Sequence, residues 1–295
     1  STLSPSSAAS DVYKRQVLKS GDKTAEEVAK KLFNLLLPSM NFIEVFPEIP
    51  AEFSRNRKVV KLDDIRNANG EILIVIGGDG TILRSLIRLG DRSLPIMAIG
   101  VGERNFLACI RRNDLEKAVD LLLSGKYITR RLSRLQATIG NEKLPPALNE
   151  VFIGTSLYGR AIRLEIRILS NERRMEIREK MDGLIVSTPT GSTAYSLSAG
   201  GPIVSSDVKS LVLTFVCSQK RLPSIILPEE SKLEVRSLSR DNPGVVVIDG
   251  NFLVKLNPLD IVNIEKSQSD AVFIDFGFCG RDSLEKWLNS TWEIK

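Results

Sequence analysis

Five residues of the N-terminal half, Gly77-Gly78-Asp79-Gly80-Thr81, place one carboxylate among three glycines directly after an apolar run. Glycine has no Cβ atom, so the backbone of this loop can approach a pyrophosphate closely. A helix that begins near Thr81 would direct its amides and the positive end of its dipole at the same anion. An Asp beside phosphates is costly unless it acts, either as a base for an attacking hydroxyl or by helping to hold a metal ion that bridges the phosphates. The alternative is a plain glycine-rich turn, and no Gly-Lys-Ser/Thr follows to make it a Walker loop.

A second run, from Thr188 to Pro202, is dense in small hydroxylated residues and reads TPTGSTAYSLSAGGP. Such residues at a turn between a strand and a helix supply hydrogen-bond donors and acceptors without bulk. Tyr195 could stack on a base or form a hydrogen bond with it. The alternative is a capped helix start inside a packed domain.

Two polar pairs, Asn149-Glu150 and Asp182-Gly183, add further candidates. Asn149 could read an adenine edge through its paired donor and acceptor groups, and Glu150 and Asp182 could accept hydrogen bonds from ribose hydroxyls. Pairs of this kind also occur as ordinary turn or surface residues.

The sequence contains no histidine. The commonest general base and the commonest metal ligand are therefore missing, and acid–base chemistry must use Asp, Glu, Lys, Tyr or Cys. This makes Asp79 the leading candidate for a base, and we assign no residue directly as a metal ligand.

The first loop lies in a segment where apolar strand-like runs alternate with helical periodicity. This alternation predicts a doubly wound, Rossmann-like α/β domain over about residues 17–125. The expected helices cover residues 22–37, 82–89 and 115–123, and the expected buried strands cover residues 71–76 and 95–99.

After Gly125 the pattern changes to short strands separated by turn residues. Apolar residues at 162, 164, 166 and 168 alternate with charged ones, which indicates a strand with one wet face. We expect an antiparallel β-sandwich over residues 126–276. A C-terminal segment, 277–295, is expected to pack back on the α/β domain with a short helix at 283–288. The further expected strands cover residues 184–186, 211–216, 232–235, 245–248, 261–264 and 271–276.

The remaining composition narrows the compartment and the partners. Residues 1–16 resemble a non-native segment and have no apolar period. Three widely spaced cysteines argue against a disulfide framework or a zinc site and favour the cytoplasm. No apolar run reaches the roughly 18–20 residues that span a bilayer. The net charge of +5 suits a small anionic substrate, and we expect no nucleic-acid partner because no aromatic–basic interleaving accompanies it.

Taken in order, these motifs resemble the ATP-dependent NAD kinases. The GGDGT loop alone is shared with lipid kinases of the same superfamily, whereas TPTGSTAYSLSAGGP after Asp182-Gly183 resembles NAD kinases specifically. Asn149-Glu150 and Asp249-Gly250-Asn251 also match the family pattern, and the resemblance covers about residues 20–280.

The resemblance implies an enzyme that phosphorylates the adenosine ribose 2′-hydroxyl of NAD with ATP, giving NADP. It implies Mg²⁺ or another divalent cation, and a homodimer or homotetramer. Asp79 would be the base, flanked by Gly78 and Gly80. The residues implied to bind substrate or cofactor are Gly78, Gly80, Thr81, Arg84, Asn149, Glu150, Lys180, Asp182, Thr190, Gly191, Ser192, Thr193, Ala194, Tyr195 and Asn251.

Within this set, the resemblance assigns individual residues to different parts of the dinucleotide. Asn149 and Glu150 would bind the adenosine side, and Lys180 and Asp182 the other half of the dinucleotide. The range 190–195 would line the adenine pocket.

Three features depart from the family pattern. The first strand expected before the helix at residue 22 looks absent or replaced. Asn105 stands before Phe106-Leu107 where many members have Gly, and residues 215–219 replace a Pro-rich, His-containing stretch. Two alternatives stay open: a lipid or sugar kinase of the same superfamily, and a non-catalytic sensor of NAD or NADP.

Overall fold

A computed structural model describes residues 14–18, 22–39, 43–46, 49–67, 70–102, 105–157, 159–239 and 242–278. The chain divides into two compact units, which are described separately below. Unit 1 contains the chain up to Arg131 together with the segment that begins at Ala271, and unit 2 contains Leu132–Asp270.

Unit 1 is built on a sheet in which every strand pairing with a recorded register is parallel. Adjacent parallel strands need crossover connections, and the helices that follow the strands supply them. In sheet order, the described strands are β3 (Val59–Lys61), β2 (Ile43–Phe46), β1 (Lys14–Leu18), β4 (Ile72–Gly77), β5 (Pro95–Gly100), β19 (Ala271–Asp275) and β6 (Ile128–Leu132).

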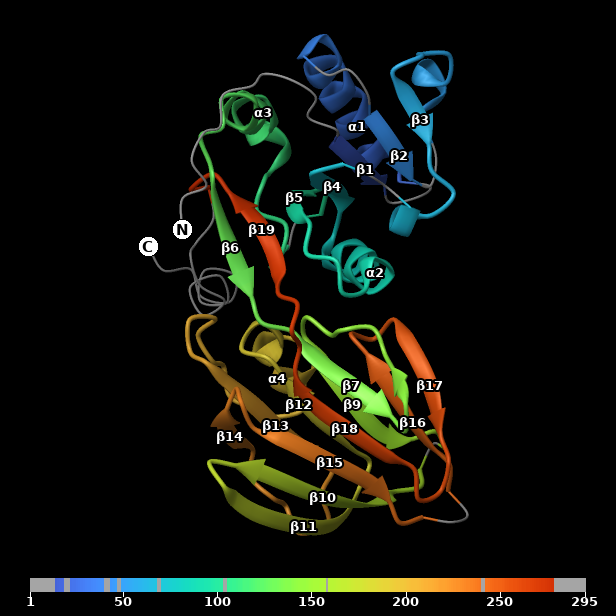
Figure 1. Cartoon of the computed structure of the whole chain (residues 1–295), viewed down its shortest axis with the longest axis vertical. Coiled ribbons are helices and arrows are strands. Elements are labelled where there is room, and N and C mark those ends of the chain that lie inside the picture. Colours follow the sequence, from blue (N-terminus) through green and yellow to red (C-terminus); the bar gives the residue numbers. More distant parts are fainter. Residues whose placement is uncertain are drawn as a thin grey trace. The chain divides into compact units, whose positions relative to one another are not determined.

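Three helices cover this sheet: α1 (Lys23–Leu36), α2 (Asp79–Leu89) and α3 (Leu115–Leu123). Helices α1 and α3 share one hydrophobic cluster with alternate residues of β4, and α2 lies on the opposite face of the sheet (Figure 1). Helix α1 starts at Asp22, whose carboxylate accepts hydrogen bonds from the N–H groups of Thr24 and Ala25. Short 3₁₀ turns lie at Leu37–Ser39, Ala51–Phe53, Ile65–Asn67 and Arg112–Asp114.

The expected α/β architecture is confirmed, and the three expected helices and two expected strands each lie within a few residues of their predicted bounds. The expected loss of the first strand is wrong. Strand β1 lies between β2 and β4 and pairs with both in parallel, with Lys14 opposite Ile43 on one side and Ile72 on the other. Its backbone pairing with two neighbours defines it as a strand despite the polar residues at its start. Residues 1–13 and 279–295, and with them the expected helix at 283–288, lie outside the described residues.

Unit 2 contains two antiparallel sheets. The first runs in the order β11 (Arg173–Met181), β10 (Ile162–Ser170), β15 (Lys232–Ser237), β18 (Ile261–Lys266), β7 (Leu135–Ile139) and β8 (Glu142–Lys143). The second runs in the order β14 (Ile225–Pro228), β13 (Ser210–Val216), β12 (Gly183–Ser187), β9 (Glu150–Thr155), β16 (Gly244–Ile248) and β17 (Phe252–Leu256).

One buried hydrophobic cluster contains residues of both sheets, which therefore pack face to face as a sandwich (Figure 1). Burial along β10 alternates except at one residue: Leu164, Ile166 and Ile168 are buried in the cluster, and Arg163 and Arg167 are exposed. Glu165, on the other face, is buried beneath its ion pairs with Arg167 and Arg178. A 3₁₀ turn η5 (Thr190–Thr193) and the short helix α4 (Tyr195–Ser198) follow β12. The expected C-terminal antiparallel sandwich is confirmed.

One strand lies in a different sheet from the expected one. We placed residues 271–276 in the sandwich, but β19 pairs in parallel with β5 in unit 1, with Val272 opposite Pro95. All of its residues are buried, as expected of a strand covered on both faces. Strand β6 likewise belongs to the sheet of unit 1. The chain thus enters the sandwich from β6 and returns to the parallel sheet through β19.

The cysteines and the helices bear on two further expectations from the sequence. Cys109 is disulfide-bonded, contrary to the expectation from cysteine number, whereas Cys217 is a free and exposed thiol. Among the described residues, no helix has the length and apolar character required to cross a bilayer.

Candidate active site

The glycine-rich loop of unit 1 joins the end of β4 to the start of α2. Gly77 ends the strand, Gly78 is the N-cap of the helix, and Asp79 is its first residue. A Cβ atom on Gly77 would lie 2.6 Å from Oγ1 of Thr81, so the strand can turn this sharply into the helix only with glycine there. The loop therefore presents the N-terminus of an eleven-residue helix at the carboxyl edge of a parallel sheet, where such folds bind anions.

Asp79 connects this loop to the next one along the sheet. Its Oδ2 accepts a hydrogen bond from the N–H of Phe106 and its Oδ1 one from the N–H of Leu107, both at 2.9 Å. The two loops meet because β4 and β5 are neighbours that end together, with Gly77 opposite Gly100. The carboxylate thereby orders both loops and is itself held in one orientation.

Asn105 sits between these loops in a space that three glycines leave open. A Cβ atom on Gly100 would lie 2.5 Å from its Nδ2, and Cβ atoms on Gly78 and Gly102 would lie 3.7 Å from its Oδ1. Its Nδ2 donates to the carbonyl of Gly102 at 2.7 Å. Its Oδ1 is buried without a hydrogen-bond partner among the described residues. Sequence reasoning noted Asn105 only as a departure from the family, although the glycines that precede it, Gly100 and Gly102, were an available signal.

Arg84 lies one turn into α2 and is exposed. Its Nη2 donates to Oγ1 of Thr81 at 3.4 Å, and its Nη1 would lie 3.6 Å from a Cβ atom on Gly80. The guanidinium is therefore held over the first turn of the helix, where it adds a positive charge to the anion-binding end.

In unit 2, Asn149 and Glu150 lead into β9, and Asp249 lies in the turn between β16 and β17. Asp249 is 3% exposed, and its carboxylate accepts the N–H groups of Leu148, Asn149 and Glu150 at 2.8, 2.8 and 3.0 Å. Burial raises the pKa of Asp249 to about 6, against the lowering effect of these three donors. The pair predicted from sequence is thus fixed by a third residue, which sequence reasoning named only as part of the Asp249-Gly250-Asn251 match and gave no role.

Glu150 is a buried carboxyl with an unusual pKa. Burial and the nearby charge of Asp249 raise its pKa to about 8, although it accepts a hydrogen bond from the N–H of Tyr195. Its Oε2 and the hydroxyl of Ser187, directly opposite on β12, are both buried without a partner among the described residues. These two oxygens form an unsatisfied polar spot beneath the hydroxyl-rich turn, where a ligand group could supply the missing hydrogen bonds.

The hydroxyl-rich run folds into η5 and α4 over this same end of the sheet. Several hydroxyls serve the turn itself: Thr188 donates to the carbonyl of Leu148 at 2.6 Å and accepts the N–H of Gly191 at 3.1 Å. Ser192 is fully buried and donates to the carbonyl of Pro189 at 2.7 Å. The half-buried members of the run, Thr190, Thr193 and Ala194, line its surface beside the exposed Tyr195.

Phe152 is a candidate that sequence reasoning missed. It lies on β9 with its ring centroid 5.6 Å from that of Tyr195, whose side chain is 44% exposed. Cβ atoms on Gly154 and Gly183 would overlap the Phe152 ring, so the two glycines make room for it on this face of the sheet. The signal was available: paired glycines on neighbouring strands leave a gap that an aromatic side chain fills.

Three further residues of unit 2 were predicted from the sequence: Lys180, Asp182 and Asn251. Lys180 is exposed at the end of β11, and Asp182 lies between β11 and β12. The carboxylate of Asp182 accepts a hydrogen bond from the thiol of Cys217 and raises its pKa. Asn251 donates from its Nδ2 to the carbonyl of Asp249 at 2.6 Å, so it braces the turn that holds Asn149 and Glu150.

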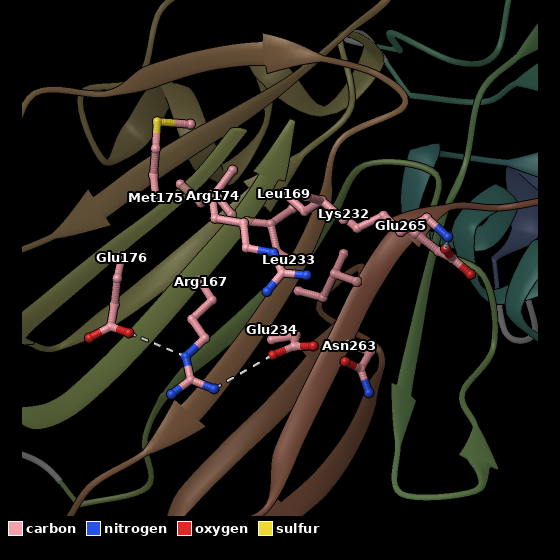
Figure 2. A pocket seen from close by; sticks show the side chains of 12 residues that line it. Arg167, Leu169, Arg174, Met175, Glu176, Lys232, Leu233, Glu234, Asn263 and Glu265 are labelled. Carbon is pink, nitrogen blue, oxygen red and sulfur yellow. Dashed lines mark hydrogen bonds and ion pairs between the residues drawn. The ribbon is translucent and has the colours of Figure 1, made fainter. Parts of the chain in front are cut away.

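A groove of about 690 Å³ lies elsewhere in unit 2, over the charged face of β10, β11, β15 and β18. Figure 2 shows Arg167 extending between Glu176 and Glu234, with which it forms ion pairs at 3.3 and 3.9 Å. None of the predicted site residues lines this groove. Its charged groups are largely paired with one another. The groove is therefore distinct from the site predicted from the sequence.

The described residues contain no group of three or more His, Cys, Asp or Glu side chains placed to hold a metal ion. Mg²⁺ in phosphoryl transfer commonly enters with the nucleotide and needs only one or two protein carboxylates. Asp79, at the phosphate loop, fits that limited role. A single carboxylate at this loop therefore suits a divalent cation that enters bound to the phosphates of a nucleotide.

Comparisons with known proteins agree with this arrangement. Residues 12–127 match the model of the ATP-NAD kinase N-terminal domain, and residues 148–276 match that of the ATP-NAD kinase C-terminal domain. An NAD kinase of Methanothermobacter thermautotrophicus is 33% identical over 251 residues, which cover 85% of this chain and 87% of the relative. An NAD kinase of Symbiobacterium thermophilum is 33% identical over 229 residues, covering 75% and 79%.

Two solved structures have a similar fold. An NAD kinase from Archaeoglobus fulgidus in complex with ATP is 25% identical, with a TM-score of 0.71 over 90% of this chain and 94% of that chain. A yeast NADH kinase complexed with NADH has a TM-score of 0.83 at 23% identity, over 97% of this chain and 90% of that chain, and shows a shared fold. Because the family's models match both halves of the chain, and a third of the residues aligned with the Methanothermobacter relative are identical, the chain belongs to the ATP-NAD kinase family.

Proposed function

We propose that this chain transfers the γ-phosphoryl group of ATP to the adenosine ribose 2′-hydroxyl of NAD, giving NADP and ADP. The observation that carries the proposal is the position of Asp79, a carboxylate fixed by two backbone N–H groups at the first residue of α2. The similarity to NAD kinases, and to the Archaeoglobus fulgidus NAD kinase in complex with ATP, supports both ligands.

The residues of unit 1 suit the phosphoryl transfer itself. The 2′-oxygen forms a bond to the γ-phosphorus, the bond to the bridging β–γ oxygen breaks, and the hydroxyl proton passes to Asp79. A carboxylate has about four acceptor positions, and Asp79 is recorded as using two of them for Phe106 and Leu107. Each oxygen therefore keeps a position for the hydroxyl. The amides of Gly78, Gly80 and Thr81 would face the phosphates, with Arg84 beside them.

A divalent cation supplies charge neutralisation on the triphosphate when it is bound. In unit 1, Asp79 would hold it. The remaining ligands would be phosphate oxygens and water, which Mg²⁺ prefers at such sites.

The residues of unit 2 suit the dinucleotide. Asn149 presents paired donor and acceptor groups to the adenine edge, and Glu150 faces the ribose. Tyr195 and Phe152 offer an aromatic pair on which a base can stack. Lys180 and Asp182 would contact the other half of NAD.

The test is NADP formation by the purified full chain with NAD and Mg²⁺, with ATP and polyphosphate compared side by side. We expect NADP with ATP as donor. A parallel panel of lipid and sugar acceptors with labelled ATP separates the alternatives. Labelling of a lipid or sugar without NADP, or NAD binding without turnover while a control NAD kinase is active, would refute the proposal.

Stacking on Tyr195 gives a second prediction. Replacing Tyr195 with Ala is expected to raise the KM for NAD by about 5- to 150-fold, because stacking of a base on an aromatic side chain contributes about 1–3 kcal/mol. Tyr195→Phe is the matched control, since it keeps the ring and loses only the hydroxyl. An equal KM for the Ala variant and the wild-type enzyme would remove Tyr195 from the base-binding role.

A homodimer or homotetramer in the cytoplasm is part of the same proposal. Exposed Leu169 and Met175, 42% and 44% exposed on the charged face of the first sheet, support association through unit 2. Light scattering coupled to size exclusion measures the mass directly.

A further inference from the structure

The segment Leu148–Glu150 is held by a residue about one hundred positions later in the chain. Oδ1 of Asp249 accepts the N–H groups of Asn149 and Glu150, and Oδ2 accepts that of Leu148. In return, the N–H of Asp249 donates to the carbonyl of Glu150 at 3.0 Å. Four hydrogen bonds at one buried carboxyl residue determine the path of the backbone into β9.

The same segment carries the hydroxyl-rich turn. The carbonyl of Asn149 accepts the N–H of Thr188 at 2.9 Å, and the carbonyl of Leu148 accepts its hydroxyl at 2.6 Å. Gly191 packs directly on the backbone of Asn149, where a Cβ atom would overlap it. A shift of residues 148–150 would therefore displace the turn that precedes Tyr195.

We propose that Asp249 is a positioning residue for NAD binding, which holds Asn149, Glu150 and the Thr188 turn in the arrangement that the dinucleotide meets. Asp249 is buried beneath these residues and acts through them rather than by contact with reacting atoms. The inference rests on the proposed function, because it assumes that Asn149 and Glu150 bind NAD.

The ionisable groups around Asp249 predict a pH dependence that can be measured. Glu150 faces Asp249 from β9, Arg134 acts on Asp249 from the start of β7, and Tyr195 donates its N–H to Glu150 from α4. The three N–H donors favour the ionised form of Asp249, and burial beside that charge favours the protonated form of Glu150. Near pH 7 the pair therefore holds one negative charge, which lies on Asp249.

The direction of the pH dependence follows from the raised pKa values. Both carboxyls have higher pKa values in the fold than in an unfolded chain, so their contribution to stability falls as the pH rises through the folded pKa values of about 6 and 8. As Glu150 ionises near pH 8, two like charges face each other under the turn. The affinity for NAD is expected to fall above that pH.

The first test is Asp249→Asn in the full chain, with steady-state kinetics in NAD and in ATP. An Asn side chain has one acceptor oxygen and one amide that would face an N–H donor, so at least one of the three bonds is lost. We expect the KM for NAD to rise by at least about tenfold while kcat and the KM for ATP stay within about threefold. The alkaline fall of kcat/KM for NAD should also be lost in this variant, because an ionised Glu150 no longer faces a second negative charge.

Asp260→Asn is the matched control. Asp260 also accepts a backbone N–H, that of Asn257 at 2.9 Å, but in the turn before β18. It is expected to leave all three parameters and the pH profile at wild-type values. Glu150→Gln is the second variant: whatever its affinity at pH 7, it should lack the alkaline fall, because Gln does not ionise.

An unchanged KM for NAD in Asp249→Asn, or equal losses in kcat and in both KM values, overturns the positioning role. If this variant does not fold, the pH profile of Glu150→Gln decides: a flat profile supports the proposal, and an alkaline fall identical to that of the wild-type enzyme overturns it. Absence of NAD binding and NADP formation by the wild-type chain at every pH instead refutes the proposed function.

Discussion

Replacing Asp79 with Asn is expected to reduce kcat for NADP formation by about 10²- to 10⁴-fold, the usual loss when a positioned acid or base is removed. An Asn side chain cannot take the proton of the attacking hydroxyl. Its amide would also face one of the two N–H donors, Phe106 or Leu107, that the carboxylate now satisfies. NAD binding should persist, because the proposed dinucleotide contacts lie in unit 2. Calorimetric titration with NAD and single-turnover NADP formation measure the two quantities separately.

The matched control is Asp63→Asn, an exposed Asp of the same unit for which no hydrogen bond is recorded. It should retain wild-type kcat and wild-type thermal stability. The Asp79 variant is also expected to lose about 1–3 kcal/mol of unfolding free energy, because a buried N–H loses its acceptor. A kcat within tenfold of wild type would exclude Asp79 as the base and leave it only its role in ordering the two loops.

The loop around Asp79 shows which structural features could be predicted from the sequence and which could not. An apolar run that stops at glycines and continues with helical spacing predicts strand, loop and helix, and all three are present. The partners of the carboxylate could not be predicted in the same way. Phe106 and Leu107 lie 27 and 28 residues later and come near only because β4 and β5 are adjacent in the sheet. Local periodicity carries no information on which strands are neighbours.

The strands β1 and β19 of unit 1 show a second limit of prediction from sequence. The residues of β1 show no apolar period, yet the backbone of this strand pairs with β2 and β4, so the neighbours rather than the side-chain pattern determine its structure. β19 was assigned to the wrong sheet because a short apolar run, here residues 271–274, fits a strand of either sheet. Its uninterrupted burial differs from the alternation of β15, and a continuous apolar run of this kind is typical of parallel sheets covered on both faces.

The hydroxyl-rich run was identified as a site from its composition, but composition did not separate ligand-facing from structural hydroxyls. Thr188 and Ser192 use their hydroxyls to close the turn, whereas Thr190 and Thr193 are half-buried at its surface. The hydrogen bonds of Asp249 were equally hidden, because its three backbone partners lie 99 to 101 residues earlier in the chain.

Gly191→Ala is expected to have the largest effect on stability among simple substitutions in unit 2. The new Cβ atom would overlap backbone atoms of Asn149, and backbone cannot move aside as the end of a flexible side chain can. Overpacking costs about 1–3 kcal/mol where side chains can adjust, so a loss of at least about 3 kcal/mol is expected here. Such a loss corresponds to a Tm lower by roughly 6–12 °C.

The same substitution should raise the KM for NAD more than the KM for ATP, because it pushes Asn149 away from the turn that it anchors. Gly140→Ala is the matched control: Gly140 has a φ of 56° and nothing lies within 4 Å of its new Cβ, so only the cost of left-handed backbone, about 1–2 kcal/mol, applies. Equal losses in the two variants would mean that Gly191 contributes only conformational freedom. A larger loss in Gly191→Ala, together with a raised KM for NAD, would show that close packing of the turn on Asn149 links the stability of unit 2 to recognition of the dinucleotide.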